Sequence, residues 1–222
     1  MPYVPSKKTD HRSKDREILD AAVEGLAREA ADEITNNLSL IEVYRNIFFR
    51  VADELAYLLK GGEVSQDHSS RLAKAIFEVG EGYEYEGAYL GEFNYAITRL
   101  IQRVPQIKVE NKEWNQEFRY WLYAATVEAL IRASTYAQSL NIGISGVFED
   151  IKDEYKRRVN TAYEAEQIIK SGDCYDAPYY TKLVKVLDAE GKFIGYQEIM
   201  LKRDRETLGK DLLSSCVVLE KF

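Results

Sequence analysis

The chain has 222 residues, of which 45% are hydrophobic and 30% are charged, as expected of a globular protein with a sizeable core. Its formal net charge of -7 argues against broad binding to nucleic acid, because the phosphate backbone attracts basic surfaces. Cys174 and Cys216 stand far apart and outside any CxxC pattern, which argues against a disulfide framework or a thiolate zinc site. Since no segment reads as a signal peptide or a membrane span, we expect a cytoplasmic protein that does not enter a membrane.

Apolar residues recur at helical spacing through most of the chain, and breaks in this pattern separate the predicted helices. We expect Ser39 to cap the second helix, and the pair Gly61-Gly62 to end it. Pro105 should end the fourth helix, because proline lacks the backbone N–H that a helix interior needs. The predicted helices span about 15–34, 39–60, 69–79, 90–104, 113–140 and 147–170.

The pattern changes after Pro178 from helical spacing to alternation. The segments "YYTKLVKVL" and "FIGYQEIML" alternate on either side of "DAEGK", which predicts a hairpin, and "LLSSCVVLE" suits a third strand. The sequence therefore predicts a mainly α protein: a helical bundle-like body with a small C-terminal antiparallel β hairpin or three-stranded sheet. We place the helical domain at 1–176 and a β-rich appendage at 177–222.

Three segments carry a resemblance to a known family: "MPYVP" at the start, "GEFNYAITRLI" at 91–101 and "GVFEDIKDEYKRRVNTAYEAEQIIKSGDCY" at 146–175. Together they resemble a short, mostly helical family of unknown function from prokaryotes and their viruses. The chain departs from the family pattern at Phe93, Ala162 and Ser171, and residues 36–89 look like an insertion. The resemblance implies no catalytic residue, but it singles out the recurring positions Glu92, Asn94, Tyr95, Glu154, Arg157, Arg158, Tyr163, Glu164 and Asp173.

These positions have a structural and a functional interpretation. Glu92 and Asn94 would stand at a helix start, where acids and Asn satisfy free N–H groups and face the positive end of the helix dipole. Arg158 could fork onto Glu92 or Glu164 and fix the register of two helices. Alternatively, the junction of Gly91–Arg99 with Glu154–Asp173 is a ligand or partner site, to which Arg99 would contribute.

Enzymatic chemistry finds little support. His11 and His68 neighbour no Ser or Cys motif, and no Gly-rich loop has the Lys-Ser/Thr of a phosphate site. The alternative is an Mg²⁺-dependent enzyme like the all-α nucleotide pyrophosphohydrolases, with Asp150, Asp153 and Glu154 as metal ligands. Acids on an amphipathic helix are more often a solvated face.

The favoured interpretation is a non-enzymatic binding or structural protein, without a cofactor, that forms a homo-oligomer and contacts a protein partner. Tyrosine supplies apolar area with a polar tip, which suits interfaces. The tyrosines that motivate this interpretation are Tyr83, Tyr85, Tyr89, Tyr120 and Tyr123, and the alternating strand "KLVKVL" offers an edge for pairing.

Overall fold

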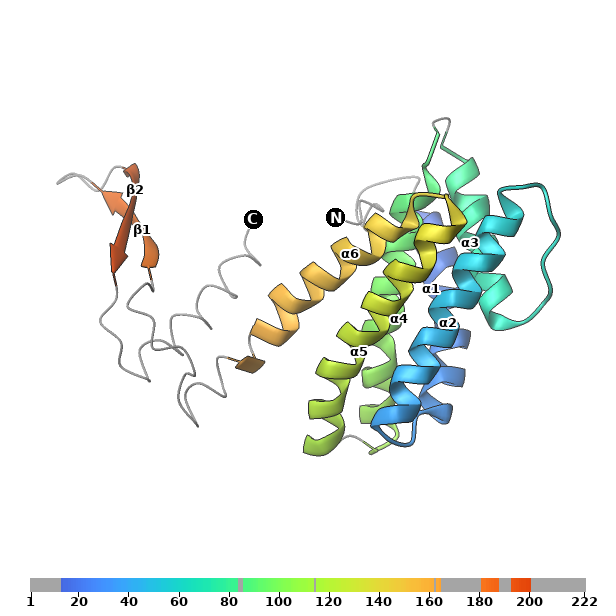
Figure 1. The fold of residues 1–222 in the computed structure, drawn as a ribbon, viewed down its shortest axis with the longest axis horizontal. Coiled ribbons are helices and arrows are strands. Elements are labelled where there is room, and N and C mark those ends of the chain that lie inside the picture. The colour runs from blue at the N-terminus through green and yellow to red at the C-terminus, as the bar shows by residue number, and fades with distance from the viewer. Residues whose placement is uncertain are drawn as a thin grey trace. The chain divides into compact units, whose positions relative to one another are not determined.

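The computed structural model describes residues 13–83, 86–113, 115–161, 163–164, 181–187 and 193–200 (Figure 1). The chain divides into two compact units, Met1–Tyr155 and Lys156–Phe222. The predicted domain boundary after Asp176 falls outside the described residues, so it stays a prediction, as does the proposed insertion at 36–89. None of the described helices is both long and apolar enough to cross a membrane.

The mainly α fold is confirmed. The first unit contains α1 (Ser13–Glu33), α2 (Asn37–Leu58), α3 (His68–Glu81), α4 (Tyr89–Glu110), α5 (Gln116–Ala137), the 3₁₀ turn η1 (Gln138–Leu140) and α6 (Ile144–Tyr155). A π-helical turn, η2 (Lys156–Asn160), belongs to the second unit. The predicted breaks at Gly61-Gly62 and at "NIGISG" are confirmed, and both breaks use left-handed backbone, at Gly61 and at Asn141.

The core gathers where three helices bring phenylalanines together. The rings of Phe93 in α4 and Phe148 in α6 meet edge-on at 5.2 Å, and Phe48 in α2 lies 5.8 Å from Phe148. α5 packs on both α2 and α6, and its buried stripe Ala125, Ala129, Ala133 and Ala137 allows close approach. α1 and α3 pack on α4, so all six helices share one core.

The start of α2 corrects one prediction. Asn36, not Ser39, is the N-cap, and its side chain accepts a hydrogen bond from the Ser39 backbone N–H at 2.9 Å. The Ser39 hydroxyl in turn accepts one from the backbone N–H of Asn36, also at 2.9 Å. The two residues therefore form a capping box, with Ser39 at the third helical position. Asn36 has the extended backbone that is typical of an N-cap residue.

The prediction that Pro105 ends the fourth helix is wrong, because α4 continues through Pro105 to Glu110. Proline removes one helical hydrogen bond, but the residues around it are strongly held by packing. Val104 is 0% exposed and Ile107 is 2% exposed, so the apolar face of α4 keeps the helix on the core across the proline. Tertiary burial thus outweighs the local preference.

α4 ends in a Schellman motif built without glycine. The N–H of Glu113 donates to the Lys108 carbonyl at 2.8 Å, and the N–H of Lys112 donates to the Val109 carbonyl at 3.0 Å. Lys112 takes the left-handed position, with φ 61°. This conformation is costly for a residue with a Cβ, and Gly is the usual choice there.

The second unit contains two described strands, β1 (Thr181–Leu187) and β2 (Phe193–Met200), which pair antiparallel. The register joins Thr181 to Met200 and Leu187 to Phe193, with an irregularity between Val186 and Leu187. The strands lie in the two segments where alternation predicts a hairpin. The third strand predicted near 212–220 lies outside the described residues.

Replacing Lys112 by glycine should stabilise the protein, because it removes the left-handed penalty at the end of α4. We expect Lys112→Gly to raise the free energy of unfolding by about 1 kcal/mol. The matched control is Lys74→Gly on the exposed face of α3, which should lower it by about 1 kcal/mol. Urea denaturation measures both, and a loss of stability in Lys112→Gly would contradict the assigned cap.

Candidate functional site

Two of the predicted site residues of α4, Tyr95 and Arg99, contact α1. Tyr95 donates its hydroxyl to Asp20 Oδ1 at 2.9 Å, and Arg99 Nε donates to the same oxygen at 3.1 Å. The Arg16 guanidinium lies 4.8 Å from the centre of the Tyr95 ring. Burial and the Asp20 carboxylate together raise the pKa of Tyr95. Tyr95 and Arg99 are therefore part of the contact between α1 and α4.

This contact continues one turn further along both helices, at Arg103. Arg103 Nε and Nη2 hold the Glu24 carboxylate at 2.6 and 3.1 Å. Its Nη1 and Nη2 hold the Glu110 carboxylate, also at 2.6 and 3.1 Å. The Arg103 side chain is only 18% exposed, so two forked pairs meet on a largely desolvated guanidinium. We call Arg16, Asp20, Glu24, Tyr95, Arg99 and Arg103 the α1–α4 seam.

The hydrogen bonds from Arg103 lower the pKa of both Glu24 and Glu110, and the two carboxylates raise the pKa of Arg103. Asp20, Glu24, Arg99 and Arg103 thus each have an opposite charge beside them, which is the arrangement of a helix–helix clamp. Arg103, Asp20 and Glu24 were missed by sequence reasoning. Their signal is the i,i+4 spacing of acids in α1 and of arginines in α4, although nothing in the sequence pairs the two rows.

The other predicted α4 residues, Glu92 and Asn94, lie near the start of the helix, as the sequence predicts. The N-cap itself is Ala88, whose side chain makes no cap hydrogen bond. Glu92 lies in the first turn, where the helix dipole favours an acid, and it is 4% exposed. Asn94 is 7% exposed and accepts a bond of 3.4 Å from the Thr98 hydroxyl.

The remaining predicted residues are divided between the two units. Glu154 is half-buried in α6, whereas Arg157, Arg158, Tyr163 and Glu164 belong to the second unit. Asp173 lies outside the described residues. The proposed junction of Gly91–Arg99 with Glu154–Asp173 therefore stays a prediction.

The carboxylates of the alternative metal site do not gather into a cage. Among the residues that the structure describes, no three His, Cys, Asp or Glu side chains come close enough to hold a metal ion. Asp153 lies 3.7 Å from the ammonium of Lys152, which also pairs with Glu149. Of the three proposed ligands, Asp153 therefore lies beside a cation of its own helix.

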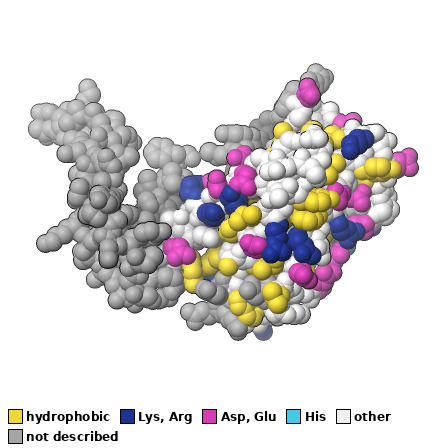
Figure 2. Space-filling view, viewed as in Figure 1, with side chains coloured by type: hydrophobic (Ala, Val, Ile, Leu, Met, Phe, Trp, Pro, Cys, Tyr) yellow, Lys and Arg dark blue, Asp and Glu magenta, His cyan; other side chains and the backbone are white. Residues whose placement is uncertain are grey.

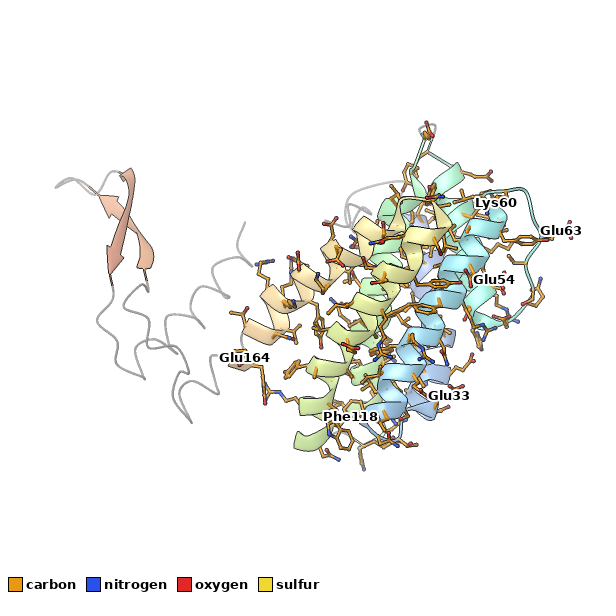
Figure 3. The ribbon with its side chains drawn as sticks, in the orientation of Figure 1. Glu33, Glu54, Lys60, Glu63, Phe118 and Glu164 are labelled. Atoms are coloured by element: carbon orange, nitrogen blue, oxygen red, sulfur yellow. The ribbon has the colours of Figure 1, made fainter. Side chains whose placement is uncertain are left out.

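A hollow of about 480 Å³ opens where the ends of α2 and α3 meet the start of α4. Its apolar walls are the half-buried side chains Leu58, Leu59, Phe77 and Tyr89 together with the buried Tyr83. We call this hollow the tyrosine pocket. Its other lining residues are Gly61, Gly80, Glu81, Glu86, Gly87 and Ala88. Figure 3 shows Lys60, next to Leu59, on the stretch that leaves α2 at this end of the bundle.

Both tyrosines of the pocket are held through their hydroxyls by distant parts of the first unit. Tyr83 donates to Asp15 Oδ2 of α1 at 3.2 Å, and Tyr89 donates to the Ile142 carbonyl before α6 at 2.9 Å. Burial is the main reason that the pKa of Tyr89 is raised, and the nearby Glu86 adds to the rise. These hydrogen bonds hold the rings of Tyr83 and Tyr89 in place as walls of the pocket. Of the five predicted tyrosines, Tyr83 and Tyr89 line the pocket, Tyr120 and Tyr123 lie on α5, and Tyr85 is outside the described residues.

Glycine shapes the pocket by close approach. A Cβ at Gly80 would lie 3.0 Å from the Cα and N of Tyr89, so a larger residue would push the start of α4 away from α3. Gly87 adopts φ 80° in the turn that leads into α4. The sequence signal for this pocket is the Gly- and Tyr-rich stretch "GEGYEYEG" at 80–87, between the third and fourth predicted helices.

Two carboxylates stand at this otherwise apolar pocket. Glu81 is the last residue of α3, where the helix dipole disfavours an acid, and Glu86 lies in the following turn. Both side chains are exposed, and neither forms an ion pair with the described residues. On the face of the helices that Figure 2 shows, by contrast, acidic and basic side chains are interspersed. The pocket therefore combines apolar walls with a local negative charge.

Comparisons with known proteins give one result. A family model described as a domain of unknown function, DUF6899, matches residues 1–174. The resemblance to a family of unknown function is thereby confirmed. No curated protein and no solved structure matches the chain.

Removing the central arginine of the seam should weaken the fold and flatten its response to acid. We expect Arg103→Gln to lose about 1–3 kcal/mol at neutral pH, since charged hydrogen bonds are lost. In the folded protein the pKa values of Glu24 and Glu110 lie below their ordinary value of 4.5. The two ion pairs therefore stabilise the fold fully above about pH 4.5, and this stabilisation is lost as the pH falls through the folded-state pKa values. Wild type should therefore lose more stability than Arg103→Gln between about pH 5 and about pH 3.

Urea denaturation at several pH values measures this difference. The control is Arg132→Gln, which breaks the exposed i,i+4 pair with Glu128 and should change stability by less than about 0.5 kcal/mol. Equal acid sensitivity of wild type and Arg103→Gln would contradict the role of the seam.

Proposed function

Because this chain belongs to the DUF6899 family, whose function is unknown, we propose a function from its geometry: it works by binding a protein partner, and not by catalysis. The observation that carries the proposal is the tyrosine pocket. Preformed apolar hollows of a few hundred Å³ with a few polar groups are where proteins bind ligands and side-chain anchors.

The partner that fits this pocket is a protein segment with an apolar anchor beside a Lys or Arg. Leu58, Leu59 and Phe77 would take the anchor, because they are half-buried in the absence of a partner. Glu81 and Glu86 would attract the basic residue. Placing an acid at the C-terminal end of α3 costs stability, and such a local conflict is expected where a residue serves binding.

No observation on the described residues favours the Mg²⁺ enzyme over this binding function. The proposal also includes self-association of the chain. It is supported by large apolar side chains that face solvent, such as Leu38, which is 73% exposed, and Tyr57, which is 55% exposed.

Selection from a displayed random-peptide library tests the pocket. We expect enrichment of peptides in which a large apolar residue neighbours Lys or Arg. The double reversal Glu81→Lys and Glu86→Lys should weaken those peptides by about tenfold or more, and should favour acidic ones instead.

The matched control is the double reversal Glu78→Lys and Glu128→Lys, which changes the net charge equally on exposed acids outside the pocket. If no motif is enriched, or if the control weakens binding as much as the pocket variant, the proposal is overturned.

Native mass spectrometry of the purified full chain tests both self-association and the choice of a binding function over the Mg²⁺ enzyme. We expect a homo-oligomer that carries no nucleotide and no divalent ion. A monomer at every concentration would contradict self-association. A copurified nucleotide or Mg²⁺ would instead favour the enzyme alternative.

A further inference from the structure

A second hollow lies near the turn between α4 and α5. It has a volume of about 300 Å³, and the residues that matter for its chemistry are Asp32, Ile34, Lys108, Glu113, Phe118 and Trp121. Figure 3 shows Glu33, the neighbour of Asp32, and Phe118 at the same end of the bundle. We call this hollow the Lys108 cavity. It shares no lining residue with the tyrosine pocket.

Lys108 is unusual because it is a buried cation, with 5% of its surface exposed. Lysine is almost never buried so far unless its ammonium is paired. Its partner is the carboxylate of Glu113, which is 51% exposed. In a Schellman motif these two positions usually make an apolar contact. The positive charge of Lys108 also suits its place in the last turn of α4, where the helix dipole favours a cation.

The two partners differ in how firmly they are held. Lys108 is enclosed, whereas Glu113 lies on the turn and can rotate into water. Because the Lys108 ammonium is buried, it needs a carboxylate partner at all times, so Glu113 can leave only when another carboxylate takes its place. The cavity therefore offers a fixed ammonium whose present carboxylate can be replaced by another one.

The rest of the cavity limits what the replacing molecule can be. The Asp32 carboxylate also lines it and forms no ion pair with the described residues, so a simple anion would meet an uncompensated negative charge. Ile34, Phe118 and Trp121 supply apolar walls. A ligand with one carboxylate, one ammonium and an apolar side chain satisfies all three features. The volume lies at the small end of ligand pockets.

We propose that the Lys108 cavity binds a free apolar α-amino acid. Its carboxylate replaces Glu113 on Lys108, its ammonium faces Asp32, and its side chain lies against Ile34, Phe118 and Trp121. The binding is non-covalent, and it is independent of the partner function proposed for the tyrosine pocket.

Isothermal titration calorimetry on the full chain tests this site, with L-leucine and L-phenylalanine as probes. We expect both to bind. L-phenylalaninamide, which lacks the carboxylate, and phenylpropanoate, which lacks the ammonium, should each bind at least about tenfold more weakly.

Variants separate a binding role from a structural one. Lys108→Met keeps the length and apolar stem of the side chain and should abolish binding. Glu113→Gln should tighten binding by about tenfold, because the internal competitor is gone. A purely structural ion pair would give no such gain. The control Glu128→Gln, an exposed acid of α5 outside the cavity, should leave the affinity unchanged.

Two outcomes overturn the proposal: neither amino acid binds wild type or Glu113→Gln, or both bind with an affinity that Glu113→Gln does not raise. If Lys108→Met does not fold, the comparison of Glu113→Gln with wild type decides alone. The double reversal of Glu81 and Glu86 should not alter amino-acid binding, so failure of one site is distinguishable from failure of the other.

Discussion

The forked ion pairs of Arg103 fix the position of α4, and both proposed sites depend on that position. Glu24 holds Arg103 from α1, and Glu110 holds it from the last turn of α4 itself. Because Asp20 holds Arg99 one turn earlier, both ion pairs between α1 and α4 form together in only one register. The start of α4 forms a wall of the tyrosine pocket, and its end carries Lys108. A shift of α4 by one turn would therefore disrupt both hollows.

The seam and the two hollows use charge in opposite ways. In the seam, Asp20 and Glu24 each lie against a guanidinium of α4, so their charges serve to join the two helices. At the tyrosine pocket, Glu81 and Glu86 lack such a neighbour among the described residues. At the Lys108 cavity, the enclosed ammonium pairs with Glu113, a carboxylate that water already reaches. Charges that are unpaired among the described residues, or paired with an exposed group, are the stronger indication of binding.

Helix content was predictable from the sequence because buried residues such as Tyr44, Phe48, Val51 and Leu55 recur at helical spacing. The errors came where distant packing overrides a local rule. Pro105 stays helical because Val104 and Ile107 are buried by other helices. The left-handed conformation of Lys112, for which no prediction was made, has the same origin, because the buried face of α4 fixes the end of the helix.

The candidate site was less predictable. Tyr83 and Tyr89 were singled out for their chemistry, but the hollow that they line forms from three helix ends that only the fold brings together. Arg103 was missed because its partner Glu24 is 79 residues away, and a single sequence does not show which distant residues pair.

The central claim is that the tyrosine pocket binds an apolar group beside a positive charge. The most direct test is an amide proton–nitrogen correlation spectrum recorded during titration with phenethylamine. The account predicts shifts at the amides of Gly61, Gly80 and Gly87, and much smaller ones with phenylacetate. Equal responses to both compounds, or shifts confined to other regions, would contradict it.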